Sequence, residues 1–332
     1  MTKLSLLDLA HVTEGGDVAT SLANAADIAR HAESLGFERY WCAEHHGMEG
    51  IASAATSVVI GHVAAATSTI RVGAGGIMLP NHSPLVIAEQ FGTLEALFPG
   101  RIDLGLGRAP GSDQRVAAAL RRNLDTNPDA FPRDVVELQS YLAGDGRTGI
   151  KATPGAGAKV PLYILGSSLF GAQVAAVLGL PYAFASHFAP QALDDALAIY
   201  RERFEPSDVL SEPYAICGYN VFAADTEEEA HLLASSMQQS FVRLRTGQPG
   251  KLPPPVEGYR ESLPPQAAAM LDGVLKATAI GTPTQVREQM QAFVDRTKAD
   301  ELIIAGSIYD HEKRKRSLTL AAGAFAGERV EV

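Results

Sequence analysis

The chain alternates short apolar segments with longer segments whose apolar residues recur at helical spacing, and this alternation continues over most of its length. Leu4–Ala10 and Glu38–His46 are apolar runs of the kind that form buried parallel strands. Between them, Ala19–Leu35 carries apolar residues on one helical face and is followed by Gly36, a suitable C-terminal cap. A strand, a helix and a second strand form a βαβ unit, so the sequence predicts parallel strands covered by helices.

Eight strands can be assigned in this way: Leu4–Ala10, Glu38–His46, Ile70–Ile77, Ile102–Gly107, Leu162–Leu165, Tyr182–Ser186, Tyr214–Ala223 and Glu301–Ala305. Helices are expected at Ala19–Leu35, Ala52–Ala66, Pro84–Leu97, Val116–Arg122, Arg133–Leu142, Gly171–Leu178, Gln191–Phe204, Thr226–Arg245, Thr282–Lys298 and Glu312–Ala324. No linker divides the chain, and 332 residues with 46% hydrophobic content can bury a large core. The pattern favours one α/β domain over residues 1–332, a (β/α)8 TIM-type barrel with insertions in the loops at its C-terminal face, over an open doubly wound sheet.

Cysteine content, apolar run length and net charge indicate where the protein is located and which partners it does not bind. Cys42 and Cys217 are far apart and form no metal-spaced pair, which is typical of a cytosolic protein with reduced thiols. The apolar run at the N-terminus is too short for a signal peptide, and later runs are interrupted before membrane length. We therefore expect a soluble, cytoplasmic protein without a membrane partner. A net charge of -10 argues against a nucleic-acid partner, because phosphate binding needs clustered Lys and Arg.

The second predicted strand ends in a run of polar side chains, Glu44, His45 and His46. α/β barrels place their chemistry at the C-terminal ends of the strands, so these residues are candidates for an active site. A strand that simply runs into a polar loop would look the same.

Glycines interrupt the third strand at Gly73, Gly75 and Gly76. Glycine weakens a strand, so these positions predict a bulge or a place where a ligand meets bare backbone. A tightly packed layer of the barrel is the alternative.

Two later strand ends carry residues suited to an anion. Arg108 follows the fourth strand, and a guanidinium there can hold a phosphate through two parallel hydrogen bonds, although an ion pair with an acidic residue is equally consistent. Gly166, Ser167 and Ser168 lie between the fifth strand and a helix start, where free backbone N–H groups favour an anion. Either serine can also act as a plain helix cap.

His187 ends the sixth strand and, with His45, His46 and His82, raises the question of a metal site. Metal-dependent barrel hydrolases usually place an H-x-H motif at the end of the first strand, whereas here that strand ends with the single His11. A Ser-His-Asp hydrolase is no better supported, because no G-x-S-x-G elbow is present. We expect no metal.

Several motifs occur together and in order: Y-W-C-A-E-H-H, V-G-A-G-G-I-M-L-P-N-H-S-P, F-P-G-R-I-D-L-G-L-G-R-A-P-G, L-G-S-S and L-G-L-P-Y-A-F. In these motifs, which span most of the chain, it resembles the bacterial-luciferase-like flavin monooxygenases, in particular the single-subunit group 1 luciferase-like oxidoreductases. The resemblance implies a TIM-type barrel that uses reduced FMN and O2, with the flavin lying across the C-terminal mouth.

The resemblance also assigns roles to single residues. It makes His45 the catalytic histidine and the bond between Gly75 and Gly76 a non-prolyl cis peptide under the flavin ring. It places Glu89 where luciferase subunits pack, so a homodimer is expected. The cofactor-binding residues that it implies are Ala74, Gly75, Gly76, Arg108, Gly166, Ser167 and Ser168.

The implied reaction is oxidation of a small organic substrate through a flavin C4a-hydroperoxide. No fused reductase domain is visible, so a separate flavin reductase is expected to supply the reduced FMN. Gly107 stands where the luciferase α subunit has a reactive cysteine, so neither light emission nor a long-chain aldehyde substrate follows. An F420-dependent oxidoreductase of the same fold and a flavin-binding protein without turnover are the alternatives.

The stretch 246–265 is rich in proline and glycine, which prevent a regular helix or a central strand. A long segment of this kind inside a compact domain is usually a lid or disordered. We expect a mobile lid-like insertion over the barrel mouth, and a mobile insertion with no catalytic part is the alternative.

Overall fold

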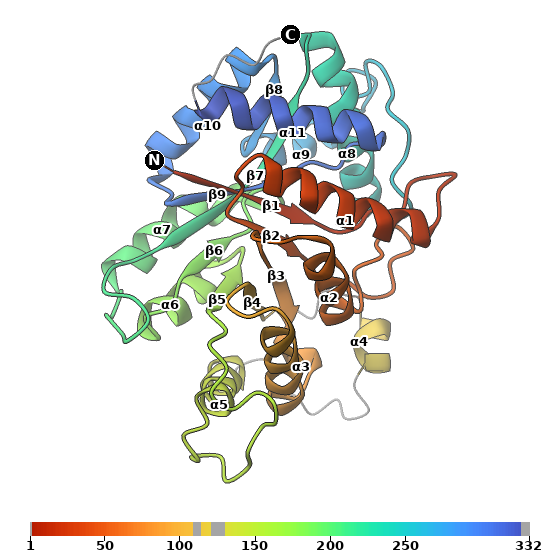
Figure 1. Ribbon diagram of the computed structural model, residues 1–332. Helices are drawn as coiled ribbons and strands as arrows, with labels where there is room; N and C mark the ends of the chain where they lie inside the picture. The colour runs from red at the N-terminus through yellow and green to blue at the C-terminus, as the bar shows by residue number, and fades with distance from the viewer. Residues whose placement is uncertain (1, 109–113, 121–129, 327–332) are drawn as a thin grey trace.

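The computed structural model describes residues 2–108, 114–120 and 130–326, and it shows a closed parallel barrel (Figure 1). The strands follow the order β6-β5-β4-β3-β2-β1-β9-β7, and pairing of β6 with β7 closes the ring. The predicted (β/α)8 barrel is confirmed. Its strands are β1 (Lys3–Asp8), β2 (Arg39–Cys42), β3 (Arg71–Met78), β4 (Ile102–Gly107), β5 (Leu162–Gly166), β6 (Tyr182–Phe184), β7 (Ala215–Ala223) and β9 (Glu301–Ala305).

One further strand, β8 (Thr278–Gly281), lies outside the ring and was not predicted. It pairs with Asn220–Ala223 of β7, beyond the stretch Ala215–Cys217 that pairs with β6. The helix that precedes it, α9 (Pro265–Leu275), was also missed.

The helices surround the barrel, and α1 lies beside α11, the helices that follow the paired strands β1 and β9 (Figure 1). They are α1 (Val18–Ser34), α2 (Thr56–Ala66), α3 (Pro84–Leu97), α4 (Gln114–Leu120), α5 (Phe131–Ala143), α6 (Leu169–Val177), α7 (Leu193–Glu202), α8 (Glu227–Arg245), α10 (Pro283–Thr297) and α11 (His311–Ala326), with short 3-10 turns η1 (Leu79–Asn81) and η3 (Pro190–Ala192). The predicted helix Val116–Arg122 corresponds to α4, and its last two residues lie outside the described ranges.

Side chains at helix starts explain where several helices begin. A capping box is present at Thr282 and Gln285, where Gln285 Oε1 accepts a hydrogen bond from Thr282 N at 2.8 Å. Thr226 Oγ1 accepts from Glu229 N at 3.2 Å and so caps α8. Asp17, which was not predicted, caps α1 through Thr20 N at 2.7 Å. Local hydrogen bonds of this kind determine the first turn of each helix.

Charged residues fill the N-terminal end of the barrel interior. The Arg39 guanidinium donates to Glu301 from Nε at 2.8 Å and from Nη2 at 3.1 Å, and Nη1 donates to Asp103 at 2.7 Å. Arg71 binds the other oxygen of Asp103 at 2.6 Å. Burial lowers the pKa of Arg39, but Glu301 and Asp103 outweigh it and raise that pKa above its ordinary value. The charges compensate one another, so this end of the barrel is structural.

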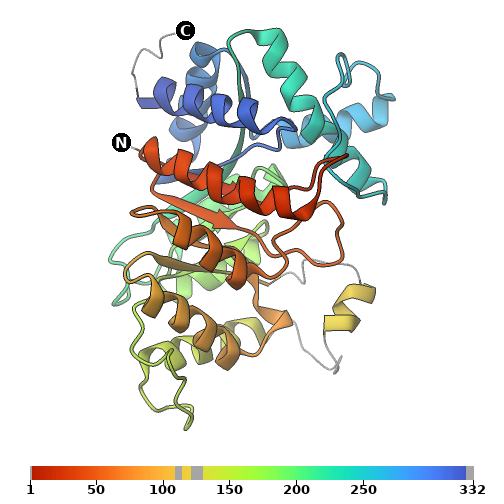
Figure 2. The same cartoon turned by 45° about the vertical axis from the view of Figure 1, so that its right-hand side comes forward.

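Above this network the interior becomes apolar. Leu7, Trp41, Ile216 and Ile303 form a buried cluster inside the ring. Polar strand ends follow at the C-terminal mouth. In Figure 2 the arrowhead of β1 points towards the side on which α4 lies. Catalytic chemistry in such a barrel belongs at this end.

The segment from 246 to 264 contains neither a helix nor a strand, as expected from its prolines. Its middle contacts the loop after β1: Leu252 N donates to Val12 O at 2.9 Å, and Lys251 Nζ donates to Gly16 O at 3.0 Å. Leu252 is buried. The segment therefore has a defined attachment beside the mouth.

Among the described helices, none has both the length and the apolar character needed to span a bilayer. Cys42 and Cys217 are both buried and free.

Candidate functional site

Three histidines lie at the ends of barrel strands, His11 after β1, His45 after β2 and His187 after β6. The ring of His11 is fixed by a 2.8 Å hydrogen bond between Nε2 and Ser307 Oγ. Burial, assisted by the nearby His45, lowers the pKa of His11 to about 4 and that of His187 to about 4. His45 thus lies within electrostatic range of His11 and of His187, and the lowered pKa values favour neutral rings at neutral pH.

His45 has the properties of a group that exchanges protons with a ligand. Burial lowers its pKa, a tendency that Glu44 opposes and His46 reinforces. Its Nδ1 is enclosed and has no hydrogen-bond partner in the part of the chain that the structure describes. A neutral imidazole with an unused nitrogen can accept or donate a proton near neutral pH.

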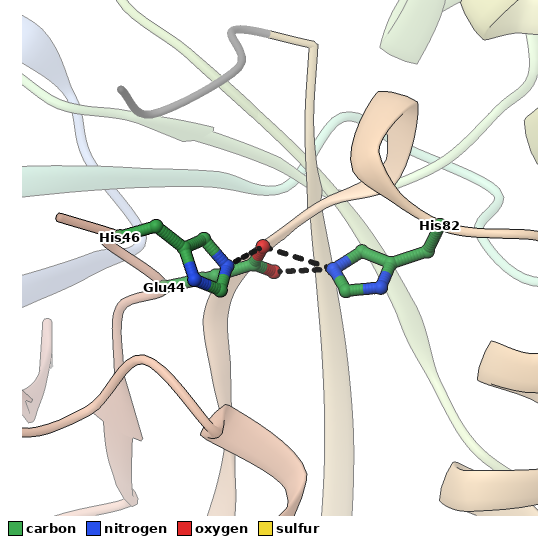
Figure 3. A group of neighbouring side chains, drawn as sticks. All are labelled: Glu44, His46 and His82. Carbon is green, nitrogen blue, oxygen red and sulfur yellow. Dashed lines mark hydrogen bonds and ion pairs between the residues drawn. The ribbon is translucent and has the colours of Figure 1, made fainter. Parts of the chain in front are cut away.

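Glu44 stands between His46 and His82, and both rings point at its carboxylate (Figure 3). His46 Nε2 lies 2.8 Å from Glu44 Oε1, and His82 Nε2 lies 2.9 Å from the same oxygen. Met78 N donates to Glu44 Oε2 at 2.9 Å. Burial raises the pKa of Glu44, but the hydrogen bonds to His82, Met78 and His46 outweigh it and lower that pKa. Glu44 is therefore a buried carboxylate that joins the ends of β2 and β3.

The same three residues could in principle hold a metal, because two imidazoles and a carboxylate are a ligand set for zinc or iron. Their separations are those of ordinary hydrogen bonds, and these bonds already account for the position of each side chain. A second group, Asp27, His311 and Glu312, joins α1 to α11 on the outside of the barrel. Neither geometry requires an ion.

The clamp formed by Glu44, His46 and His82 also positions His45. Backbone pairing continues past the end of β2, because Ala43 N donates to Asp8 O and Glu44 N donates to Gly76 O, both at 3.2 Å. Side chains alternate along extended backbone, so Glu44 and His46 fall on one side and His45 on the other.

The glycine-rich part of β3 packs too closely for side chains. A Cβ on Gly75 would lie 2.9 Å from Trp41 Cβ, and one on Gly76 would lie 2.7 Å from Gly105 O. The register of β3 against β4 shifts between Ala74 and Ile77, so the expected bulge is present. The peptide bond between Gly75 and Gly76 is cis, and that prediction is confirmed. Tight packing, the alternative reading of these glycines, is thus also correct.

Ala74 does not present its side chain to the mouth. It is fully buried and belongs to the core between the barrel and the helices. Only its backbone can contact a ligand in the barrel mouth.

Arg108 and the start of α6 come together on the β4–β5 side of the mouth. The guanidinium carbon of Arg108 lies 4.2 Å from the ring centroid of Phe170, in the first turn of α6. Ser168 is the N-cap residue, but its side chain makes no capping bond, so the first N–H groups of α6 remain available. Ser167 and Ser168 are exposed, and Gly166 packs against Gly171, 3.6 Å from a hypothetical Cβ to Gly171 Cα. A guanidinium beside free helix N–H groups fits a phosphate.

The predicted residues therefore lie along the same end of the barrel. His45 follows β2, and the backbone of Ala74, Gly75 and Gly76 belongs to β3. Arg108 follows β4, and Gly166–Ser168 lie at the end of β5. Sequence reasoning missed the stacking of Phe170 on Arg108 and the role of His82 as a partner of Glu44. It noticed His187 only as part of a metal site. Nothing local in the sequence could have shown these pairings, because each joins different loops.

Known proteins are similar to this chain over most of its length. The family model described as luciferase-like monooxygenase matches residues 2–300. A luciferase-like monooxygenase of Escherichia coli K12 is 52% identical over 318 residues, covering 96% of this chain and 95% of its own. The N-acetyl-S-alkylcysteine monooxygenase of Bacillus subtilis 168 is 32% identical over 340 residues and covers 98% of each chain.

Solved structures show the same fold. Apo-MsnO8 superposes with a TM-score of 0.88 at 36% identity and covers 98% of this chain and 99% of its own. The oxygenating constituent of 3,6-diketocamphane monooxygenase from Pseudomonas putida, in complex with FMN, gives a TM-score of 0.73 at 19% identity and covers 98% of each chain. The resemblance expected from the sequence motifs is confirmed, and the chain belongs to the luciferase-like monooxygenase family.

Proposed function

We propose that this chain is an FMN-dependent monooxygenase that uses reduced FMN and O2 to oxidise a small organic molecule. The observation that carries the proposal is the placement of Arg108 against the uncapped start of α6, at the same barrel mouth as the neutral His45. Family membership supports oxygenase chemistry, and the related diketocamphane enzyme is a complex with FMN.

The residues present fit FMN. Arg108 and the first N–H groups of α6 would hold the 5′-phosphate, with the hydroxyls of Ser167 and Ser168 beside it. The backbone of Ala74, Gly75 and Gly76, which lacks projecting side chains at its two glycines, would face the ring system. The reduced flavin supplies the electrons for reaction with O2.

The protein's own contribution is proton control and exclusion of water. His45 is held by the clamp of Glu44, His46 and His82, and the accessible part of its imidazole can hold or deliver a proton. The segment 246–264 is attached beside the mouth, and we propose that it acts as a lid that keeps water out during turnover.

Partners follow from the same proposal. A separate flavin reductase would supply the reduced FMN to this cytoplasmic enzyme. We also propose a homodimer through α2 and α3, where Glu89 lies. Val58 on α2 is 70% exposed and Val86 on α3 is 43% exposed, so these contacting helices present apolar side chains to the outside.

Spectroscopic titration with FMN, reduced FMN and F420 tests the cofactor, and oxygen uptake with a flavin reductase tests turnover. We expect tight binding of reduced FMN and substrate-dependent oxygen uptake. Preference for F420 would make the chain a deazaflavin oxidoreductase, and FMN binding without oxygen uptake under any substrate would make it a flavin-binding protein. Activity that chelators abolish would instead indicate a metal enzyme.

A further inference from the structure

The ring of His187 packs against the backbone of β7 at Gly218. A Cβ placed on Gly218 would lie 2.1 Å from His187 Nδ1, 3.0 Å from Cε1 and 3.1 Å from Cγ. The Nδ1 edge of the ring therefore rests directly on the backbone of Gly218. Any residue other than glycine at this position would displace the ring.

The backbone around His187 is fixed to the same strand. Asn220 Nδ2 donates to His187 O at 2.8 Å, and Ser186 Oγ donates to Gly218 O at 2.5 Å. Ser186 and Asn220 are themselves buried, at 0% and 4% exposure. Two buried side chains thus connect the backbone of this loop to β7.

No described side chain or backbone group bonds Nδ1 of His187, which is fully enclosed. An enclosed N–H without an acceptor is rarer than an enclosed acceptor without a donor, so the proton belongs on Nε2. Nε2 lies on the edge opposite Gly218, and the residue as a whole is half-buried, so that edge faces the accessible side. Because burial lowers the pKa of His187 to about 4, the ring stays uncharged at neutral pH.

We propose that His187 is a substrate-binding residue that donates Nε2–H to an uncharged oxygen acceptor, such as the carbonyl of a ketone, aldehyde or amide. The term substrate rests on the proposed monooxygenase function. A neutral imidazole can polarise a carbonyl without itself carrying charge. Below the ring the interior is apolar at Ile216, and a carboxylate there would lose hydration without gaining a counter-charge from His187.

A positively charged side chain beside the same loop would favour a different class of substrate. Arg245 stacks on Phe188, the next residue after His187, with its guanidinium carbon 5.0 Å from the ring centroid. An anionic substrate would be drawn to Arg245 instead. The test must therefore compare a neutral oxygen acceptor with an anion of similar shape.

The direct experiment is long-range 1H–15N NMR on the full chain labelled with 15N-histidine, with the His187 signals assigned by their loss in His187→Gln. We expect the neutral Nε2–H tautomer between about pH 6 and pH 8. Cyclohexanone at high millimolar concentration should shift the Nε2–H signal, and cyclohexanecarboxylate at the same concentration should not. A charged ring, the Nδ1–H tautomer, a larger response to the carboxylate, or no response to cyclohexanone would each overturn the proposal.

Variants give the second measurement. His187→Phe keeps an aromatic ring without a donor and should weaken cyclohexanone binding about three- to tenfold, whereas His187→Gln, which retains an N–H donor, should recover most of that loss. Gly218→Ala should abolish the response by displacing the ring. Equal binding in all variants would refute the donor role.

Failure of the proposed function gives a different pattern. If the wild-type protein does not bind FMN, the flavin titration is negative while the tautomer and probe response of His187 are unchanged. If His187 is wrongly assigned, FMN binds normally and only the probe response is absent. FMN titration of the wild type alongside the NMR measurement separates the two.

Discussion

Replacing Glu301 with glutamine should destabilise the protein strongly, because it removes a negative charge from the ion-pair network at the N-terminal end of the barrel interior. Glu301 is fully buried and accepts two bonds from Arg39, at 2.8 and 3.1 Å, and one from Tyr214 OH at 2.8 Å. In the wild type, Arg39 and Arg71 face Glu301 and Asp103, so the charges balance. Glu301→Gln leaves Arg39 and Arg71 to share Asp103, and the only other carboxylate near Arg39 among the described residues is the partly exposed Glu38, 3.8 Å from Nη2.

The magnitude follows from those contacts. Breaking one side of a buried ion pair typically costs about 3 to 5 kcal/mol, a large part of a total stability of about 5 to 15 kcal/mol. An unfolding entropy of about 2.1 cal/mol/K per residue gives roughly 0.7 kcal/mol/K for 332 residues, so the melting temperature should fall by about 4 to 7 °C.

Trp41 provides the assay. It is the single tryptophan of the chain, and its Nε1 donates to Asp103 at 3.1 Å, so its fluorescence reports on the network during urea and thermal unfolding. Glu312→Gln, at a side chain that is 76% exposed, is the matched control and should change stability by less than about 0.5 kcal/mol.

A double variant tests the reasoning more sharply. Arg39→Met with Glu301→Leu removes the pair and leaves Asp103 balanced by Arg71, so it should lose clearly less stability than the two single changes added together. A loss below about 1 kcal/mol in Glu301→Gln, or simple additivity in the double variant, would refute the argument.

Arg108→Ala should weaken FMN binding by about 1.5 to 3 kcal/mol in a fluorescence titration, and an unchanged affinity would place the phosphate elsewhere. His45→Ala should retain FMN affinity but lower substrate-dependent oxygen uptake about 100- to 10,000-fold, and unaltered uptake would reject its catalytic role. The folded-state pKa of His11 is lowered from 6.5 to about 4, so the contribution of neutral His11 to stability is fully present above pH 6.5. This contribution is lost as the pH falls from 6.5 to about 4. As the pH is lowered through this range, the melting temperature of His11→Asn should therefore fall less steeply than that of the wild type. Trypsin should cleave near Lys251 or Arg260 more slowly once FMN is bound, and equal rates would make the segment a passive loop.

The eight barrel strands could be predicted because each is a local pattern, a short apolar run bounded by turn residues. The same locality placed His45 and Arg108 just beyond the ends of β2 and β4, although β2 ends at Cys42, four residues before the predicted end at His46. Strand β8 was not predicted, because its pairing with β7 depends on where β6 stops, and no local pattern shows that.

Hydrogen-bond partners that are far apart in the sequence could not be predicted for a related reason. His82 is 38 positions from Glu44, and Glu301 is 262 positions from Arg39. Such pairs form between loops or between strands that are not adjacent in the ring, and a local sequence pattern does not show which of these segments meet. The chemistry of a candidate residue is readable from its type and place, but its protonation and orientation depend on these distant partners.

The unusual pairing of β7 bears on how this enzyme can change. One edge of β7 is shared between β6, at Ala215–Cys217, and β8, at Asn220–Ala223, while β9 pairs along the other edge. A strand held along both edges cannot slide, so the wall that carries Gly218 is a constant of the scaffold. The segment 246–264 is attached to the loop after β1 at Lys251 and Leu252 but is not paired along both edges. Evolution, or a mutagenesis library, should therefore find new substrate preferences by varying this loop while the wall behind His187 stays the same.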